Sequence, residues 1–364
     1  MRTRPAVTNL SGPAFAETLR WSPSALRVYA PPQFPMTTFR GRLLFVMFLL
    51  AFGPAAAQQE PTFSAESNVV LVPTLVMDAK GNAVYGLRAR DFLIEDNGVE
   101  QVSHLDETAE AQPVSVMIAI QCGRRAAREF TRMQGLASML QPVLSAPNTE
   151  TALLFFDSTL TLAHDFTNDS NVIDKDLKEL QPGDEGARIL DAVAYSLKLL
   201  NELPEGRQRV LLLISETRDH GSHFAKLDDV ITLAGTTSTA IYALPFSPSI
   251  SSVLDTERGS NKDERQPAPD LLAPLSMARQ AMRKNIPKAI ASMTGGEYEL
   301  FSSRKGFETG MNTFANHLHS RYLLSFQPEN PRPGLHQTRV RLRDSTPNQA
   351  VLSRTNYWAG ESSQ

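Results

Sequence analysis

A thiol and a guanidinium lie close together in the sequence, because Cys122 and Arg128 are separated by only five residues. At this spacing a thiolate, the intervening loop amides and an arginine can hold a phosphate, as in thiol-dependent phosphatases. The pair also follows a predicted buried strand and precedes a predicted helix. However, only Gly123 would let this loop curl round a phosphate. A small, semi-buried structural cysteine is therefore the better interpretation.

Polar residues after a second predicted strand offer two further chemistries. Asp219 and His220 could join Cys122 in a nucleophilic Cys–His–Asp arrangement. His220 and His223 could ligate a metal, but they lie in a loop without clustered partner ligands. An ordinary polar loop with surface histidines is the better interpretation of both observations.

The elements that would position these residues alternate between strands and helices. Continuous apolar runs predict strands covered on both faces, and apolar residues at helical spacing predict helices between them. Such alternation indicates a Rossmann-like α/β fold, a mostly parallel sheet flanked by helices with right-handed crossovers. The strands are expected at 114–120, 151–156, 209–215, 238–244 and 321–326, and the helices at 123–144, 172–180, 189–203, 227–234, 268–294 and 306–320.

Two β-rich segments flank this α/β region. The first has a strand containing Pro73, which suggests an edge position, and a hairpin turn at Asp96-Asn97-Gly98. About 45 residues of strands and turns are rarely stable alone, so this small N-terminal β module should pack on the α/β region. The second forms a C-terminal β tail. The expected divisions are a small β domain at 58–110, the α/β domain at 111–326 with a mobile insertion at 247–268, and the β extension at 327–364.

The segment 36–57 has the features of a secretory signal peptide. Arg40 and Arg42 precede an apolar stretch, and three alanines end the segment. The apolar stretch is about half of the ~20 residues that a membrane-spanning helix needs. The sequence therefore predicts a secreted or periplasmic protein with no stable membrane insertion after cleavage. Residues 1–35 do not fit in front of a signal peptide, so we expect them to be a non-native upstream extension and translation to start at Met36.

Charge and cysteine content exclude several classes of protein. The 364 residues carry 36 Lys and Arg and 39 Asp and Glu. Residues 1–57 hold six arginines and one glutamate, so the predicted mature chain has 364 − 57 = 307 residues and a net charge of 30 − 38 = −8. Nucleic-acid binders usually carry a basic excess, which this chain lacks. A single cysteine excludes intrachain disulfides and cysteine-based zinc sites.

Several stretches resemble the von Willebrand factor A (VWA) family, in particular its exported bacterial members with a preceding β module. They are VVLVPTLVMDAKGNAVYGLRARDFLIEDNG, PVSVMIAI, HDFTND, RVLLLISETRD and RYLLSFQPENP. The resemblance covers most of residues 65–358 and rests on many moderate matches. It implies a VWA-like α/β fold and binding of other proteins through loops at one edge of the sheet.

The resemblance also implies a metal-ion-dependent adhesion site, in which Asp, two Ser, Thr and Asp residues surround a divalent ion. Here the matching positions hold Gln121, Gly123, Arg125, Ala187 and Glu216, with Cys122 and Arg124 between the first three. Only Glu216 keeps a carboxylate. Two arginines would also repel a cation, so we expect no bound metal and no cofactor. One hypothesis is that Arg124 or Arg125 replaces the ion, pairing with Glu216 and facing a carboxylate of the partner. The alternative is that both arginines are solvated surface charges.

The sequence thus favours a non-enzymatic, exported protein that binds a protein partner through this degenerate site. Two alternatives stay open. One is a thiol-dependent phosphatase that uses Cys122 and Arg128, and the other is an envelope scaffold whose loops bind nothing.

Overall fold

A computed structural model describes residues 8–9, 69–106, 112–123, 126–246, 273–329, 331–344 and 349–360, with the side chains of Thr8, Asn9, Ala127 and Ala273 excepted. All of them belong to one compact unit, formed by Met1–Leu19 and Asn68–Gln364. The predicted signal peptide at 36–57, the predicted insertion at 247–268, and Arg124 and Arg125 lie outside the described residues.

A six-stranded sheet forms the centre of the α/β half, in the order β1-β8-β7-β6-β9-β10. Strands β7, β6, β9 and β10 run parallel, whereas β8 is antiparallel to β7. The short β1 pairs with β8 and lies in the stretch predicted to be an upstream extension, and the predicted start at Met36 stays a prediction. The strands are β1 (Thr8–Asn9), β6 (Val114–Gln121), β7 (Thr149–Phe156), β8 (Leu160–Thr167), β9 (Gln208–Ile214) and β10 (Thr239–Ala243).

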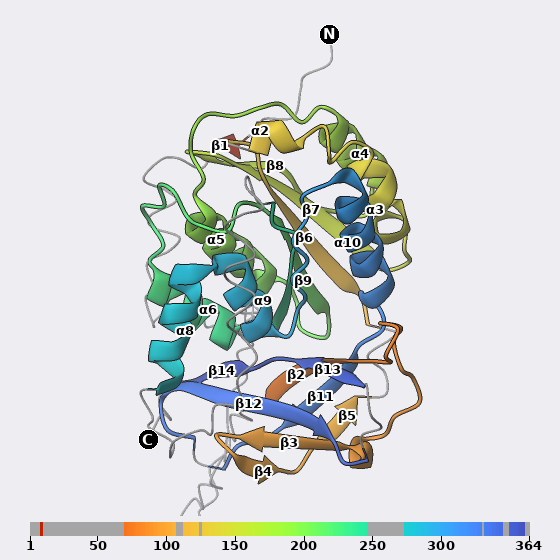
Figure 1. The fold of residues 1–364 in the computed structure, drawn as a ribbon, viewed down its shortest axis with the longest axis vertical. Helices are drawn as coiled ribbons and strands as arrows, with labels where there is room; N and C mark the ends of the chain where they lie inside the picture. The colour runs from red at the N-terminus through yellow and green to blue at the C-terminus, as the bar shows by residue number, and fades with distance from the viewer. Residues whose placement is uncertain are drawn as a thin grey trace, which may run out of the picture. The chain divides into compact units, whose positions relative to one another are not determined.

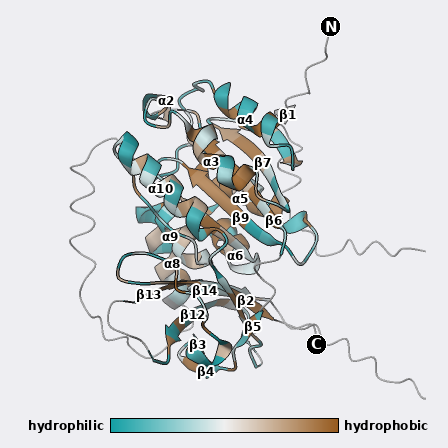
Figure 2. Cartoon of the chain, turned by 90° about the vertical axis from the view of Figure 1, so that its right-hand side faces the viewer, coloured by the Kyte–Doolittle hydropathy of each residue, from teal (hydrophilic) through white to brown (hydrophobic). Residues whose placement is uncertain are grey.

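Helices cover both faces of this sheet, which explains why β6 is apolar throughout. Met117 and Ala119 face one core, and Ile118 and Ile120 face the other. Figure 1 shows the two helical layers, and Figure 2 shows apolar strands beneath helices with hydrophilic outer surfaces. One layer holds α5 (Ile189–Glu202), α6 (Leu227–Thr236), α8 (Ala273–Lys284) and α9 (Ile286–Thr294), and the other holds α3 (Leu136–Leu144), α4 (Ser170–Lys178) and α10 (Arg304–His317). This architecture confirms the expected α/β fold, a mostly parallel sheet flanked by helices.

The single helix expected at 123–144 is wrong. The structure has α2 (Ala126–Glu129) and α3, separated by turns. Gly135 precedes α3 with a φ of 86°, a left-handed conformation that interrupts a helix and that glycine adopts without strain. No helix of the described residues is long and apolar enough to cross a membrane.

The two flanking β segments form one sandwich rather than a module and a separate tail. One sheet has the order β13-β2-β11-β5 and the other β14-β12-β3-β4, so each sheet combines strands from both ends of the chain. The strand expected in the α/β domain at 321–326 is β11, and it pairs with β2 and β5 instead. The strands are β2 (Val70–Met77), β3 (Phe92–Asp96), β4 (Val99–Gln101), β5 (His104–Asp106), β11 (Tyr322–Phe326), β12 (Gly334–Leu342), β13 (Ala350–Ser353) and β14 (Asn356–Ala359). A short 3₁₀ helix, η1 (Ala89–Asp91), precedes β3.

The edge position expected for Pro73 is also wrong, because β2 has a neighbouring strand on each side. Pro73 is tolerated there because the ladder between β2 and β13 ends at the Thr74–Ser353 pair. Pro73, which has no N–H group to donate, therefore has no β13 residue opposite it.

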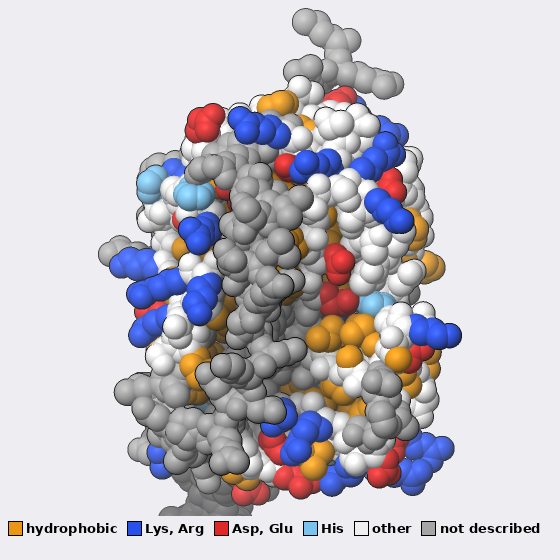
Figure 3. All heavy atoms as spheres, in the orientation of Figure 1, with side chains coloured by type: hydrophobic (Ala, Val, Ile, Leu, Met, Phe, Trp, Pro, Cys, Tyr) orange, Lys and Arg blue, Asp and Glu red, His pale blue; other side chains and the backbone are white. Residues whose placement is uncertain are grey.

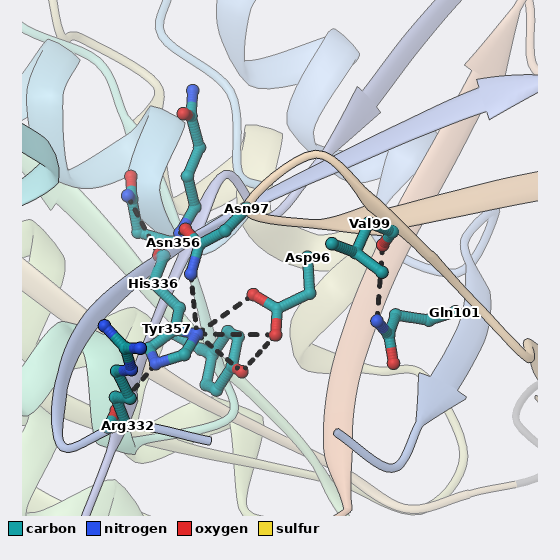
Figure 4. A network of polar contacts seen from close by, with 9 residues as sticks. Asp96, Asn97, Val99, Gln101, Arg332, His336, Asn356 and Tyr357 are labelled. Atoms are coloured by element: carbon teal, nitrogen blue, oxygen red, sulfur yellow. Dashed lines mark hydrogen bonds and ion pairs between the residues drawn. The ribbon is translucent and has the colours of Figure 1, made fainter. Parts of the chain in front are cut away.

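A buried polar cluster joins β3, β12 and β14 inside the sandwich (Figure 4). The Nδ1 atom of His336 lies 3.0 Å from the Asp96 carboxylate, which also accepts a 2.9 Å hydrogen bond from the Tyr357 hydroxyl. The Nε2 atom of His336 lies 2.7 Å from the Arg332 carbonyl oxygen and donates to it. The hydrogen bond with Asp96 raises the pKa of His336, and burial opposes that shift only in part. The cluster satisfies its buried polar groups and so fixes the alignment of these three strands.

Arg354 joins the sandwich to the α/β half. It follows β13, is 3% exposed, and donates to the carbonyl oxygens of Ala234 at 3.2 Å and of Gly235, in the last turns of α6. It also donates at 2.7 Å to the carbonyl oxygen of Asn356. Helix C-terminal carbonyls carry partial negative charge and stabilise a cation. Burial lowers the pKa of Arg354 to about 10, so the side chain stays protonated at neutral pH.

Replacing this guanidinium should destabilise the protein strongly. We expect Arg354→Met to lower the free energy of unfolding by about 3 kcal/mol, because several buried carbonyl groups lose their donor. Urea unfolding followed by circular dichroism measures this. The exposed Arg90, changed to Met, is the matched control and should change stability by less than about 0.5 kcal/mol. Equal effects of the two substitutions would contradict the role given to Arg354.

Candidate functional site

The predicted site lies at the carboxyl ends of the parallel strands, which we call the upper edge. Strands β6 and β9 are neighbours with Ile120 opposite Ile214. Gln121, which ends β6, and Glu216, two residues beyond β9, therefore come together. Both are buried, with 0% and 5% of their surface exposed.

The nitrogen and the oxygen of the Gln121 side-chain amide both hydrogen-bond to Glu216. The Nε2 atom of Gln121 donates to the Glu216 carboxylate at 3.0 Å, and its Oε1 atom accepts from the Glu216 backbone N–H at 2.8 Å. The same Nε2 atom donates to the Gly123 carbonyl oxygen at 3.3 Å. Protein atoms thus satisfy the polar groups that would otherwise face a metal.

The loop at 183–187 packs directly on Gly123. A Cβ atom at Gly123 would lie 2.3 Å from the Gly186 carbonyl oxygen and 2.6 Å from that of Asp184. The Gly183 N–H donates to the Cys122 carbonyl oxygen at 3.0 Å. The absence of a side chain at Gly123 therefore allows this loop to close over the end of β6.

Two carboxylates that the sequence interpretation missed hold this loop in place. Asp157 accepts from the backbone N–H groups of Thr159 at 2.7 Å and Asp184 at 3.2 Å. Asp184 accepts from the N–H groups of Ser158 at 2.9 Å and Gly186 at 2.8 Å. Their signal in the sequence is position: Asp157 directly follows a predicted strand, and Asp184 lies between two glycines.

Ala187 is placed by its backbone. It is fully buried, and it exchanges two hydrogen bonds with His220, of 3.0 and 2.9 Å. Asp191, at the start of α5, accepts from the N–H groups of His223 and Ala225 at 3.0 and 2.7 Å. Desolvation raises the pKa of Asp191, against the lowering effect of these hydrogen bonds. The upper loops are therefore held together by hydrogen bonds between carboxylates and main-chain amides.

These residues do not fit the divalent metal of an adhesion site. The amide of Gln121 is committed to Glu216, while Gly123 and Ala187 offer no side-chain oxygen. Among the described residues, no group of three or more His, Cys, Asp or Glu side chains could hold a metal ion. The structure brings Gln121, Cys122, Gly123, Ala187 and Glu216 to one edge, whereas Arg124 and Arg125 lie outside the described residues.

The environment of Cys122 counts against nucleophilic catalysis. Its side chain is buried, and its Sγ atom lies 3.5 Å from the Ile120 carbonyl oxygen, to which it donates. Burial, with a smaller contribution from the charge of Asp157, raises the thiol pKa to about 12. Arg128 is exposed, and no described hydrogen bond joins Cys122 to His220. The geometry therefore supports a structural cysteine.

The known proteins to which this chain is similar are all solved structures. No protein-family model and no curated protein matches the sequence. The chain is similar to a von Willebrand factor type A protein from Catenulispora acidiphila, at 8% identity over 82% of this chain and 76% of that one, with a TM-score of 0.42. It is also similar to the conserved hypothetical protein BatB from Bacteroides thetaiotaomicron, at 14% identity over 56% and 98%, with a TM-score of 0.36. A third similar structure is the pilus adhesin SpaC from Lactobacillus rhamnosus GG, at 10% identity over 74% and 41%, with a TM-score of 0.36.

A methyl group at Gly123 should displace the loop that packs on it. We expect Gly123→Ala to lower the free energy of unfolding by about 2 kcal/mol, because rigid backbone atoms would have to move. Chemical denaturation measures the change. Gly360→Ala is the control, since no atom lies within 4 Å of a Cβ there, and it should change stability by less than about 0.5 kcal/mol. If Gly123→Ala is as stable as the control, the close packing is refuted.

The thiol of Cys122 should react slowly in the folded protein. Only the thiolate is nucleophilic, and a pKa of about 12 leaves very little of it at neutral pH. We expect iodoacetamide to leave the native chain largely unmodified over hours and to alkylate it within minutes in urea, as measured by intact-protein mass spectrometry. Rapid alkylation without denaturant would instead favour the phosphatase alternative.

Proposed function

We propose that this chain is an exported protein that binds a protein partner at the upper edge without a divalent metal. The observation that carries the proposal is the reciprocal pairing of Gln121 with Glu216, at 3.0 and 2.8 Å. The pairing uses the one carboxylate left at the degenerate site. A metal ion that displaced the Gln121 amide from the Glu216 carboxylate would break their hydrogen bond and would gain a single charged ligand in return.

A cation is still needed if the partner contributes a carboxylate. Arg124 and Arg125 directly follow Gly123 in the sequence, three and four positions after Gln121. A guanidinium binds a carboxylate through two parallel hydrogen bonds and keeps its charge at every physiological pH. We therefore assign partner binding to these arginines and propose an acidic contact residue on the partner.

The export signal and the fold fit this role. The predicted signal at 36–57 would deliver the chain to the periplasm or the cell exterior, where binding proteins of the envelope act. The buried thiol of Cys122 makes the phosphatase alternative weaker, because its thiolate would be scarce.

Metal independence and the role of the arginines can be tested together. We expect the purified chain to capture the same envelope protein in EDTA as in Mg²⁺, and Arg124→Ala with Arg125→Ala to lose that capture. The control removes two exposed arginines of the sandwich, Arg88 and Arg90, and should bind normally. Capture that needs Mg²⁺, or that survives loss of both arginines, would overturn the proposal.

Thermal unfolding gives an independent measure of metal binding. A ligand at a hundred times its dissociation constant stabilises the folded state by about 2.7 kcal/mol. We expect millimolar Mg²⁺, Mn²⁺ or Ca²⁺ to leave the melting temperature unchanged. A rise in melting temperature that Glu216→Gln abolishes would show a metal site.

A further inference from the structure

The sandwich has two uncovered strand edges that line one groove. Residues 334–359 form a hairpin whose return strand divides: β14 pairs with the first half of β12, whereas β13 pairs with β2 in the other sheet. Within the described residues, the second half of β12 therefore pairs with β3 alone, and β13 pairs with β2 alone. Val340, Leu342, Val351 and Leu352, from both uncovered edges, line a groove of about 1600 Å³.

The hydrogen-bond pattern shows which amides of β12 point into the groove. Asn97 donates to the Gln337 carbonyl oxygen at 2.8 Å, and Arg343 donates to that of Asp91 at 2.9 Å. In an antiparallel ladder, bonded pairs alternate, so Arg339 and Arg341 also bond to β3. Val340 and Leu342 therefore direct their N–H and C=O groups away from β3. An extended peptide can pair with such a free edge.

Apolar side chains form part of the groove surface. Met77, Val351 and Leu352 line the groove and are partly exposed, and Val340 and Leu342 belong to the sandwich core beside them. Figure 3 shows an apolar patch over this part of the sandwich, below acidic and histidine side chains. Val351 faces the sandwich core, as Val340 and Leu342 do, whereas Leu352 and Met77 face the other side of their sheet. Every second residue of a strand faces the same side, so an added strand would place alternate side chains beside Val340, Leu342 and Val351.

The rim of the groove carries three cationic side chains. Lys80, Lys288 and Arg339 line the groove, and none of them makes an ion pair with the described residues. The acidic residues of the groove are Glu297 and Glu299.

The two carboxylates do not cancel this charge. Glu297 is bound by His317 at 2.9 Å and by Arg321 at 3.2 Å. Burial raises the pKa of Glu299, with a smaller contribution from the charge of Glu297. The charge of the groove therefore favours binding of a negatively charged occupant.

We infer that this groove binds an extended segment of a partner protein, with acidic residues at its ends and alternating apolar residues between them. The segment adds as a strand to the free edge of β12 and places its apolar side chains beside Val340, Leu342 and Val351. This site is separate from the upper edge, and its occupant is selected by backbone pairing and by Lys80 and Arg339.

Amide hydrogen exchange tests the free edge directly. In the full chain without a partner, the Val340 and Leu342 amides should exchange fast, and those of Arg339 and Arg341 slowly, as measured by NMR. The probe is a fluorescein-labelled peptide of about eight residues, a typical strand length, that alternates valine and threonine between terminal aspartates. Binding should slow exchange at Val340 and Leu342. Slow exchange of these two amides in the free monomer, or no change with bound peptide, would overturn the inference.

Charge reversal tests the selection of the occupant. Lys80→Glu, Lys288→Glu and Arg339→Glu together should weaken binding of the aspartate peptide about tenfold in fluorescence anisotropy, and a lysine-ended peptide should bind the wild type poorly. Lys175→Glu, an exposed cation on α4, is the control and should leave affinity unchanged.

The outcomes also separate this inference from the proposed function. Loss of peptide binding in the charge-reversed chain with normal capture at Arg124 and Arg125 would support two separate sites. Equal affinity for aspartate and lysine peptides would refute the charge argument. A concentration-dependent dimer that protects Val340 and Leu342 without peptide would assign the groove to a second copy and overturn the inference.

Discussion

The buried guanidinium of Arg354 determines how the two halves of this protein are joined. It lies where the return strand of the sandwich divides into β13 and β14, and it binds the last carbonyl groups of α6. A buried cation without a carboxylate partner is costly unless its donors are satisfied, so this point of the chain has little freedom. Gly235 of α6 completes the contact, because a Cβ atom there would lie 2.9 Å from that of Trp358. The fixed position of Arg354 also separates β13 from β14. Because β14 continues towards α6 and β13 pairs in the other sheet, the facing edges of β12 and β13 are left unpaired among the described residues.

At the upper edge, Gln121 and Glu216 hydrogen-bond to each other at two of the positions that correspond to metal ligands in an adhesion site. A divalent ion concentrates charge and requires several oxygen ligands, whereas the Gln121 amide offers one donor and one acceptor that match the side chain and the backbone of Glu216. The surrounding loops follow the same principle, since Asp157 and Asp184 accept main-chain N–H groups of neighbouring turns. Protein groups thus make the hydrogen bonds that hold the described loops of this edge together.

The sequence predicts the parts of this structure that depend on local pattern. The apolar run at 114–120 indicates a strand covered on both faces, and the residues at the adhesion-site positions show the loss of metal ligands. The sequence does not predict which sheet contains β11. Its apolar residues Leu324 and Phe326 would fit the core of either sheet, and only long-range pairing decides between the two. The pairing of Gln121 with Glu216 is equally hidden, since it joins residues 95 positions apart. The break before α3 had a local signal in Gly135, which the helical spacing of the apolar residues outweighed.

The two binding surfaces that we propose would attract acidic partners to a chain that is itself acidic. With a net charge of −8 in the predicted mature protein, long-range electrostatics repel acidic proteins, and attraction must come from local clusters of cations within about a Debye length. The groove supplies such a cluster in Lys80, Lys288 and Arg339, and we assign the same role at the upper edge to Arg124 and Arg125. Because the general field opposes encounter, binding at either surface should depend on close contact and on the geometry of the hydrogen bonds. Overall repulsion combined with local attraction favours selectivity over fast association. A partner that lacks the matching backbone edge or carboxylate meets only the repulsion from the acidic chain.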